Sequence, residues 1–156
     1  MTFRLTSTAF EPGADIPPHF TCDGADCSLP LDWTDPPSGT ETLALIMDDP
    51  DAPRGTWVHW VLYDLPADAR QLPESTVPRD RLPSGARQGV NDFHRIGYNG
   101  PCPPPGAPHR YYFRLYALST QLNLQPRATR AKLDGAMRGH ILAKTEMFGR
   151  YQRKSS

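Results

Sequence analysis

Residues 42–65 read TLALIMDDPDAPRGTWVHWVLYDL, two apolar runs joined by an acidic turn that contains prolines 50 and 53. The first run, TLALIMD at 42–48, is almost continuously apolar, which is typical of a strand buried on both faces. The second run, TWVHWVLYDL at 56–65, is rich in aromatic and β-branched residues, which favour strands. These features predict two long strands in the interior of a sheet, joined by a turn that the prolines stiffen.

Further strands are expected on both sides of this pair. The segment RYYFRLYAL at 110–118 alternates so that every second residue from Tyr111 to Ala117 shares one face. Residues 3–10 form another candidate strand. The chain has 18 prolines, about twice the usual share, and their clusters separate the apolar runs. The predicted fold class is therefore mainly β (α+β), with irregular loops.

The last third of the chain has a different periodicity. From Ala128 to Phe148, apolar residues recur at three- and four-residue spacing, which predicts one amphipathic helix. Gly149 is expected to end this helix. His140 lies on its apolar side and is interpreted as a packing residue rather than a ligand.

Length and charge exclude several classes of protein. At 156 residues, the chain is expected to form a single domain, 1–156. Its 17 basic and 17 acidic residues cancel, so the chain has no net positive charge that would attract it strongly to nucleic acid. Acidic residues predominate in 1–78, however, and basic residues predominate in 79–156. No apolar run approaches the roughly 18 residues of a membrane span. The N-terminal segment MTFRLTSTAF lacks the pattern of a signal peptide, so the expected location is cytoplasmic.

The chain has three cysteines, Cys22, Cys27 and Cys102. An odd number argues against a disulfide framework and predicts three thiols in a reducing compartment. No CxxC pair and no HExxH motif is present, so neither a metal site nor a cofactor is expected.

Two loop–strand junctions carry the polar residues that could make a site. The acidic cluster Asp48-Asp49-Pro50-Asp51 ends one strand, and His59 follows inside the next, where alternation places it on one face with Trp57 and Val61. A buried imidazole needs a partner or a cavity.

The second junction follows a proline-rich loop. His109 and Tyr111 lie two residues apart at the start of a strand, and glycines 100 and 106 allow the preceding loop to approach a ligand closely. Imidazole, phenol and backbone N–H donors suit an anion such as phosphate or carboxylate. The sequence therefore predicts an anion pocket built from both junctions.

The same motifs resemble a known family. DPDAP at 49–53, WVHW at 57–60 and GPCPPPGAPHRYYF at 100–113 resemble the phosphatidylethanolamine-binding protein family, and the terminal segments STAFEPGADIPPHFTCDGADCSLPLDW and GHILAKTEMFGRYQR look like its bacterial Raf kinase inhibitor-like branch. The resemblance covers almost the whole chain in order. It implies a central antiparallel sheet with a second small sheet and peripheral helices.

The resemblance also implies an anion pocket at one end of the main sheet, accepting phosphate-like groups such as phospholipid headgroups. The positions that match pocket residues of the family are Asp49, Asp51, Ala52, Pro53, Trp57, His59, Gly100, Pro101, His109 and Tyr111.

Two functions remain open from the sequence. The first is a non-enzymatic binding protein, which the resemblance extends to modulation of a kinase or protease and to a homodimer. The second is a hydrolase in which the His, Asp and Tyr residues supply acid–base chemistry. No serine or cysteine nucleophile stands in a recognisable motif, which favours the first.

Overall fold

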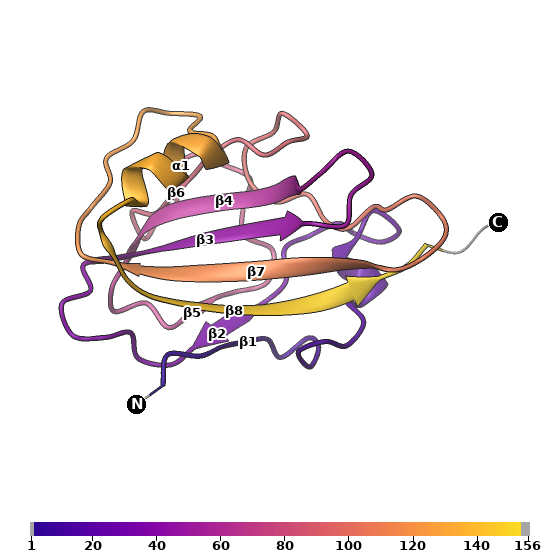
Figure 1. Cartoon of the computed structure of the whole chain (residues 1–156), viewed down its shortest axis with the longest axis horizontal. Helices are drawn as coiled ribbons and strands as arrows, with labels where there is room; N and C mark the ends of the chain where they lie inside the picture. The colour runs from indigo at the N-terminus through magenta and orange to yellow at the C-terminus, as the bar shows by residue number, and fades with distance from the viewer. Residues whose placement is uncertain (1, 154–156) are drawn as a thin grey trace.

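A five-stranded antiparallel sheet with the order β6-β4-β3-β7-β8 forms the centre of the computed structural model, which describes residues 2–153 (Figure 1). Its strands are β3 (Thr42–Asp49), β4 (Trp57–Pro66), β6 (Arg87–Gln88), β7 (His109–Leu118) and β8 (Ile141–Tyr151). A second antiparallel sheet has the order β1-β2-β5, with β1 (Leu5–Thr6), β2 (Leu31–Trp33) and β5 (Gln71–Leu72). The helical elements are the 3-10 helix η1 (Pro18–Phe20) and α1 (Arg130–Met137).

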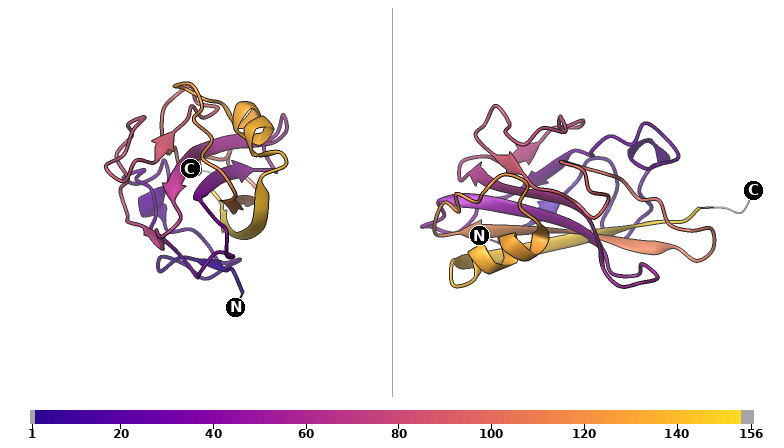
Figure 2. Two further views of the ribbon diagram at one scale, coloured as in Figure 1. Left: turned by 90° about the vertical axis from the view of Figure 1, so that its left-hand side faces the viewer. Right: turned by 90° about the horizontal axis from the view of Figure 1, so that it is seen from above.

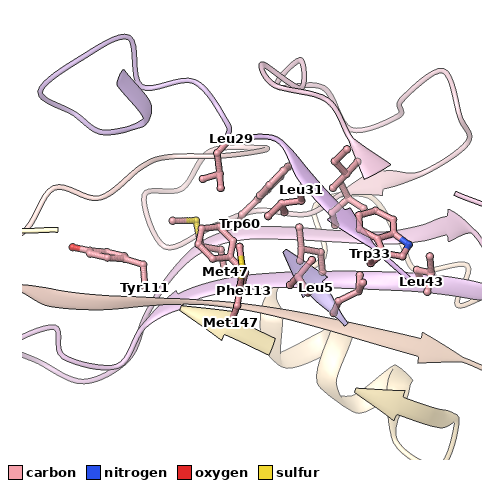
Figure 3. Close-up of a cluster of buried hydrophobic side chains, with 14 of the residues drawn as sticks. Leu5, Leu29, Leu31, Trp33, Leu43, Met47, Trp60, Tyr111, Phe113 and Met147 are labelled. Atoms are coloured by element: carbon pink, nitrogen blue, oxygen red, sulfur yellow. The ribbon is translucent and has the colours of Figure 1, made fainter. Parts of the chain in front are cut away.

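Each face of the central sheet buries its own hydrophobic cluster. The small sheet and the N-terminal segment cover one face, where Met47, Trp60 and Phe113 are fully buried (Figure 3). Helix α1 covers the other face, where Leu133 and Met137 pack against residues that include Ile46 (Figure 2). All eight residues of β3 are buried, because β3 is central and covered on both sides. The mainly β fold class is thus confirmed.

The helix predicted over 128–148 is wrong beyond residue 137. Only Arg130–Met137 is helical, and Gly139, at φ 83°, turns the chain into β8. The reason is pairing, because β8 runs beside β7 from Leu118↔Ile141 to His109↔Tyr151. His140 is consequently exposed and outside the helix. Gly149 does not end a helix but lies inside β8, where a Cβ atom would collide with Phe10 and Ile16.

The prediction of three free thiols is also wrong. Cys22 and Cys102, 80 residues apart, form a disulfide, and only Cys27 is free. An odd number of cysteines does not prevent one pair from forming when the fold brings two of them together. The predicted first strand is likewise shorter than expected, since only Leu5–Thr6 of residues 3–10 pairs.

Ion pairs connect the acidic N-terminal half of the chain to its basic C-terminal half. Arg110 pairs with Asp51, Arg114 and Arg130 pair with Asp48, and each pair connects the basic half to the acidic half. Within residues 2–153, no helix has the length and apolar character to cross a membrane.

Candidate functional site

A cavity of about 330 Å³ is lined by residues from the end of β3 and the start of β7. Figure 1 shows that these two strand ends lie at the same end of the central sheet. The cavity contains seven of the residues that the sequence proposed, from both loop–strand junctions: Asp49, Ala52, Pro53, Trp57, His59, His109 and Tyr111. The antiparallel pairing of β3 with β7 and with β4 brings these distant segments together.

A β-bulge in β4 sets the direction of His59. Met47 pairs with Trp60 and Asp48 pairs with Val58, so His59 is an extra residue with no partner on β3. The expectation that His59 shares a face with Val61 is therefore wrong, because Val61 packs in the cluster under α1. A bulge re-aims the side chain beside it, and here it places the His59 ring edge-to-face against Tyr111, at 5.3 Å between ring centroids.

Asp49 holds His109 at the cavity wall. Its Oδ2 accepts a hydrogen bond from His109 Nδ1 at 2.7 Å, and its Oδ1 accepts one from the Asp51 backbone N–H at 2.8 Å. Since a carboxylate only accepts, the Nδ1 of His109 carries the proton of this bond. The pair is largely shielded from water, with side-chain exposures of 12% for His109 and 6% for Asp49.

His59 is oriented in the same way by a backbone group. Its Nδ1 lies 2.6 Å from the carbonyl oxygen of Asn99, which can only accept, so Nδ1 is the donor. Burial lowers the pKa of His59 below its ordinary value, against the opposing effects of the Asn99 hydrogen bond and the Asp49 carboxylate. The neutral form of each histidine therefore has an unprotonated Nε2.

Tyr111 adds a buried hydroxyl to the same wall. Within residues 2–153 its oxygen has no hydrogen-bond partner, and Figure 3 shows it directed away from the hydrophobic cluster. Burial, and then the nearby Asp49 carboxylate, raise the pKa of Tyr111 well above its ordinary value, so the phenol stays a donor. An unpartnered buried hydroxyl is costly, and a ligand in the cavity would satisfy it.

Three of the proposed residues lie outside the cavity and support its walls. Asp51 binds Arg110 through both carboxylate oxygens, at 2.9 Å each, and this pairing lowers the pKa of its carboxyl. Gly100 donates its N–H to Asp26 at 2.8 Å, and Pro101 accepts from the backbone N–H of Cys22 at 3.1 Å. These contacts hold the turn after β3 and the proline-rich loop in place.

Other residues of the cavity wall were not proposed from the sequence: Arg54, Gly55, Phe93, Cys102, Pro103 and Pro104. Cys102, Pro103 and Pro104 lie inside the 100–113 motif, and Arg54 and Gly55 directly follow the 49–53 motif, so slightly wider motif boundaries could have included them all. Phe93 had no sequence signal, and it stands edge-to-face between Trp57 and His59 at 5.6 and 5.2 Å between ring centroids. Arg54 makes no ion pair with any residue of 2–153 and brings a positive charge to the cavity.

Gly100 offers a direct test of its supporting role. A Cβ atom at this position would overlap the carbonyl oxygen of Phe20 and approach Asp26 Oδ1 to 2.6 Å. We expect Gly100→Ala to lower the free energy of unfolding by about 1–3 kcal/mol through overpacking. Gly135→Ala is the matched control, because a Cβ atom there meets nothing within 4 Å and alanine favours the helix. Equal stability of the two variants in urea unfolding would contradict this role.

The fold and the site together define a β-sheet protein with a pocket of polar and aromatic side chains at one end of its central sheet. Residues 6–152 match the family model described as phosphatidylethanolamine-binding protein. The chain belongs to this family, abbreviated PEBP, as the motifs had indicated.

Individual relatives agree over nearly the whole chain. A UPF0098 protein of Methanothermobacter thermautotrophicus is 47% identical over 150 residues, which cover 96% of this chain and 99% of the relative. The crystal structure of the PEBP homologue CT736 from Chlamydia trachomatis superposes with a TM-score of 0.90 at 39% identity, covering 98% of this chain and 99% of that one. Escherichia coli YbcL, described as a member of the mammalian PEBP family, gives a TM-score of 0.91 at 33% identity, covering 99% and 100%.

Proposed function

We propose that this protein is a non-catalytic binding protein whose end-of-sheet cavity takes a phosphate-like anion. The observation that carries the proposal is the convergence of His59, His109 and the unpartnered Tyr111 hydroxyl on one cavity. Both histidines use Nδ1 for a protein acceptor, which leaves Nε2 for a ligand. Membership of a family described by its binding of phosphatidylethanolamine supports the same class of ligand.

Protonation controls whether this pocket attracts an anion. With both histidines neutral, the negative charge of Asp49 opposes the positive charge of Arg54, and neither Nε2 can donate. One proton on each ring turns each Nε2 into a charged donor. The anion therefore binds the protonated pocket, and binding raises the pKa of His59, which burial lowers in the free protein.

The outer part of the cavity suits an organic group on the anion. Trp57 is 38% exposed, although it is a large aromatic residue. Together with Phe93 and the loop prolines it gives an apolar and aromatic wall. An aromatic face of this kind accepts an alkyl chain or an ammonium group, so an organic phosphomonoester is a better ligand than free phosphate.

Hydrolysis is the weaker alternative. The Asp49–His109 pair resembles an acid–base unit, but the cysteine at the cavity, Cys102, is bound in a disulfide and cannot act as a nucleophile. Modulation of a kinase or protease, a homodimeric state and a cytoplasmic location stay predictions from the sequence. The disulfide removes one argument for the cytoplasmic location, because that prediction rested partly on three reduced thiols.

Anion binding is expected to strengthen as the pH falls. Sulfate is the probe for this measurement, because its own charge stays constant between about pH 8 and pH 5. While the pH lies above the pKa of the free histidine, each unit of decrease strengthens binding by up to about tenfold for each proton taken up. Because burial lowers the pKa of His59, the gain continues below about pH 6.5, the ordinary pKa of histidine. Calorimetry across this range measures it, and a flat profile would count against the proposal.

Single substitutions test whether the anion binds in the cavity or is held only by general charge attraction to the protein surface. We expect His59→Ala and His109→Ala each to weaken binding of phosphate and of an alkyl phosphate about tenfold or more, as for the loss of a charged hydrogen bond. His94→Ala, in an exposed loop, is the control and leaves both unchanged. Trp57→Ala should weaken only the alkyl phosphate. Unchanged affinities in both pocket variants, or turnover of the alkyl phosphate by the wild-type protein, would overturn the proposal.

A further inference from the structure

Three side chains of types that bind metal ions lie close together, and none of them belongs to the pocket motifs. His19 of η1, Cys27 of the following loop and Glu74, which follows β5, each offer a ligand atom, and these atoms all lie within 4.8 Å of one another. His19 Nε2 is 3.3 Å from Cys27 Sγ and 3.4 Å from Glu74 Oε2. The residues belong to separate segments, so no ligand motif in the sequence announced the cluster.

Hydrogen bonding alone does not account for this geometry. Both close contacts are made by the same atom, His19 Nε2, which carries at most one hydrogen. If Nε2 is protonated, its one hydrogen makes a full hydrogen bond to only one of the two neighbours. If it is unprotonated, it accepts from the Cys27 thiol and faces the lone pairs of Glu74. An ion at the centre would engage all three atoms at once.

The two separations that involve His19 Nε2 match those around a tetrahedral zinc ion, and Cys27 Sγ lies within 4.8 Å of the Glu74 carboxylate. Zinc binds histidine nitrogen and carboxylate oxygen at about 2.0–2.2 Å and thiolate sulfur at about 2.3 Å. At tetrahedral angles these bond lengths put neighbouring ligand atoms about 3.4–3.6 Å apart. The two observed contacts are therefore within about 0.3 Å of the arrangement that the ion requires.

Backbone hydrogen bonds hold the three ligand-bearing segments together without the ion. The N–H of Asp26, next to Cys27, donates to the carbonyl oxygen of His19 at 3.1 Å. The N–H of Ser75, next to Glu74, donates to the carbonyl oxygen of Ser28 at 2.9 Å. These hydrogen bonds connect the His19 and Cys27 segments to each other and the Glu74 segment to the Cys27 segment. Binding of a metal ion therefore requires little rearrangement of the backbone.

We propose that His19, Cys27 and Glu74 form a Zn²⁺ site, with water as the fourth ligand. Imidazole, thiolate and carboxylate together form a donor set that zinc takes in proteins, and three protein ligands plus water is the open form of such sites. Binding converts the Cys27 thiol to a thiolate, and its proton passes to the buffer. His19 and Glu74 are about half exposed, at 53% and 47%, so the ion enters directly from solvent.

Titration of the full chain with its disulfide intact tests the site. Co²⁺ serves as the spectroscopic probe and Zn²⁺ as its competitor. The expected result is one ion per chain, a sulfur-to-cobalt charge-transfer band that Zn²⁺ removes, and one proton released per ion. Zn²⁺ should also raise the midpoint of thermal unfolding and protect Cys27 from alkylation.

Substitutions assign the ligands. We expect Cys27→Ser to remove the charge-transfer band, and Cys27→Ser, His19→Ala and Glu74→Gln each to weaken Zn²⁺ binding about tenfold or more. The control variants are His140→Ala, which changes an exposed histidine, and His109→Ala, which changes the pocket; both should leave the affinity unchanged. Circular dichroism confirms that each variant is folded.

Several outcomes would overturn the site. These are Zn²⁺ binding of unchanged affinity in Cys27→Ser, loss of binding in His109→Ala, and a wild-type protein that binds no ion at millimolar Zn²⁺. Because the pocket proposal is tested with anions, the two proposals fail independently of each other.

Discussion

Asp48→Ala is expected to lower the free energy of unfolding by about 3–5 kcal/mol. The Asp48 side chain is 1% exposed and receives Arg114 through two hydrogen bonds of 3.0 Å and Arg130 through one of 2.8 Å. Its removal leaves two partly buried guanidinium groups with only their partly exposed partners, Glu146 for Arg114 and Asp134 for Arg130. Loss of the buried partner of a charge is far more costly than loss of a surface contact. The midpoint of thermal unfolding should fall by roughly 10 °C.

Glu146→Gln is the matched control for this prediction. Glu146 also binds Arg114, at 2.9 Å, but its side chain is 38% exposed. A partly exposed pair contributes little, so a loss below about 1 kcal/mol is expected. If Asp48→Ala does not fold, Asp48→Asn keeps the shape and still removes the charge. Losses for Asp48→Asn no larger than for Glu146→Gln would show that burial of this carboxylate does not matter.

Loss of the Cys22–Cys102 disulfide is expected to have the second largest effect. The bond closes a loop between residues 80 positions apart, and a cross-link of this span restricts the unfolded chain strongly. We expect the double variant Cys22→Ser/Cys102→Ser to lose about 2–4 kcal/mol of unfolding free energy. The bond also ties the proline-rich loop, which lines the cavity, to the segment after η1. Weaker alkyl phosphate binding should therefore accompany the loss of stability.

Cys27→Ser controls for the loss of a thiol without the loss of a cross-link. Cys27 is partly buried and free, so its replacement should change the unfolding free energy by about 0.5 kcal/mol or less in zinc-free buffer. Thiol titration of the denatured wild-type protein should detect one thiol before reduction and three after it. Three thiols before reduction would contradict the disulfide.

The strands in the interior of the sheet could be predicted because their signals are local. The continuous apolar run of β3 and the alternation of β7 depend only on neighbouring residues, and β3, β4 and β7 lie within a residue or two of their expected bounds. The prediction for β8 was wrong because its sequence, ILAKTEMFGRY, fits both the periodicity of a helix and that of a strand. Its alternation of Ala143, Thr145 and Met147 with charged residues was the strand signal, and pairing with β7 selects it.

The candidate site shows the same division. The two motifs named most of the residues around the cavity, since proline, glycine, histidine and aspartate at strand ends are visible in the sequence. The bulge at His59 and the position of Phe93 in the cavity wall could not be predicted, because both depend on the packing of the 91–99 segment against β4. There the backbone N–H groups of Asp92 and Asn99 donate to Val58 and His59.

Local patterns in the chain were therefore enough for the mainly β class, its interior strands and the family. Three features depend on the folded chain: the Cys22–Cys102 bond, the bulge that directs His59 toward Tyr111, and the proximity of His19, Cys27 and Glu74. Each joins residues, or aligns strands, across long stretches of sequence. Short-range periodicity carries no information about such contacts, because they form only when distant segments pack around the same core.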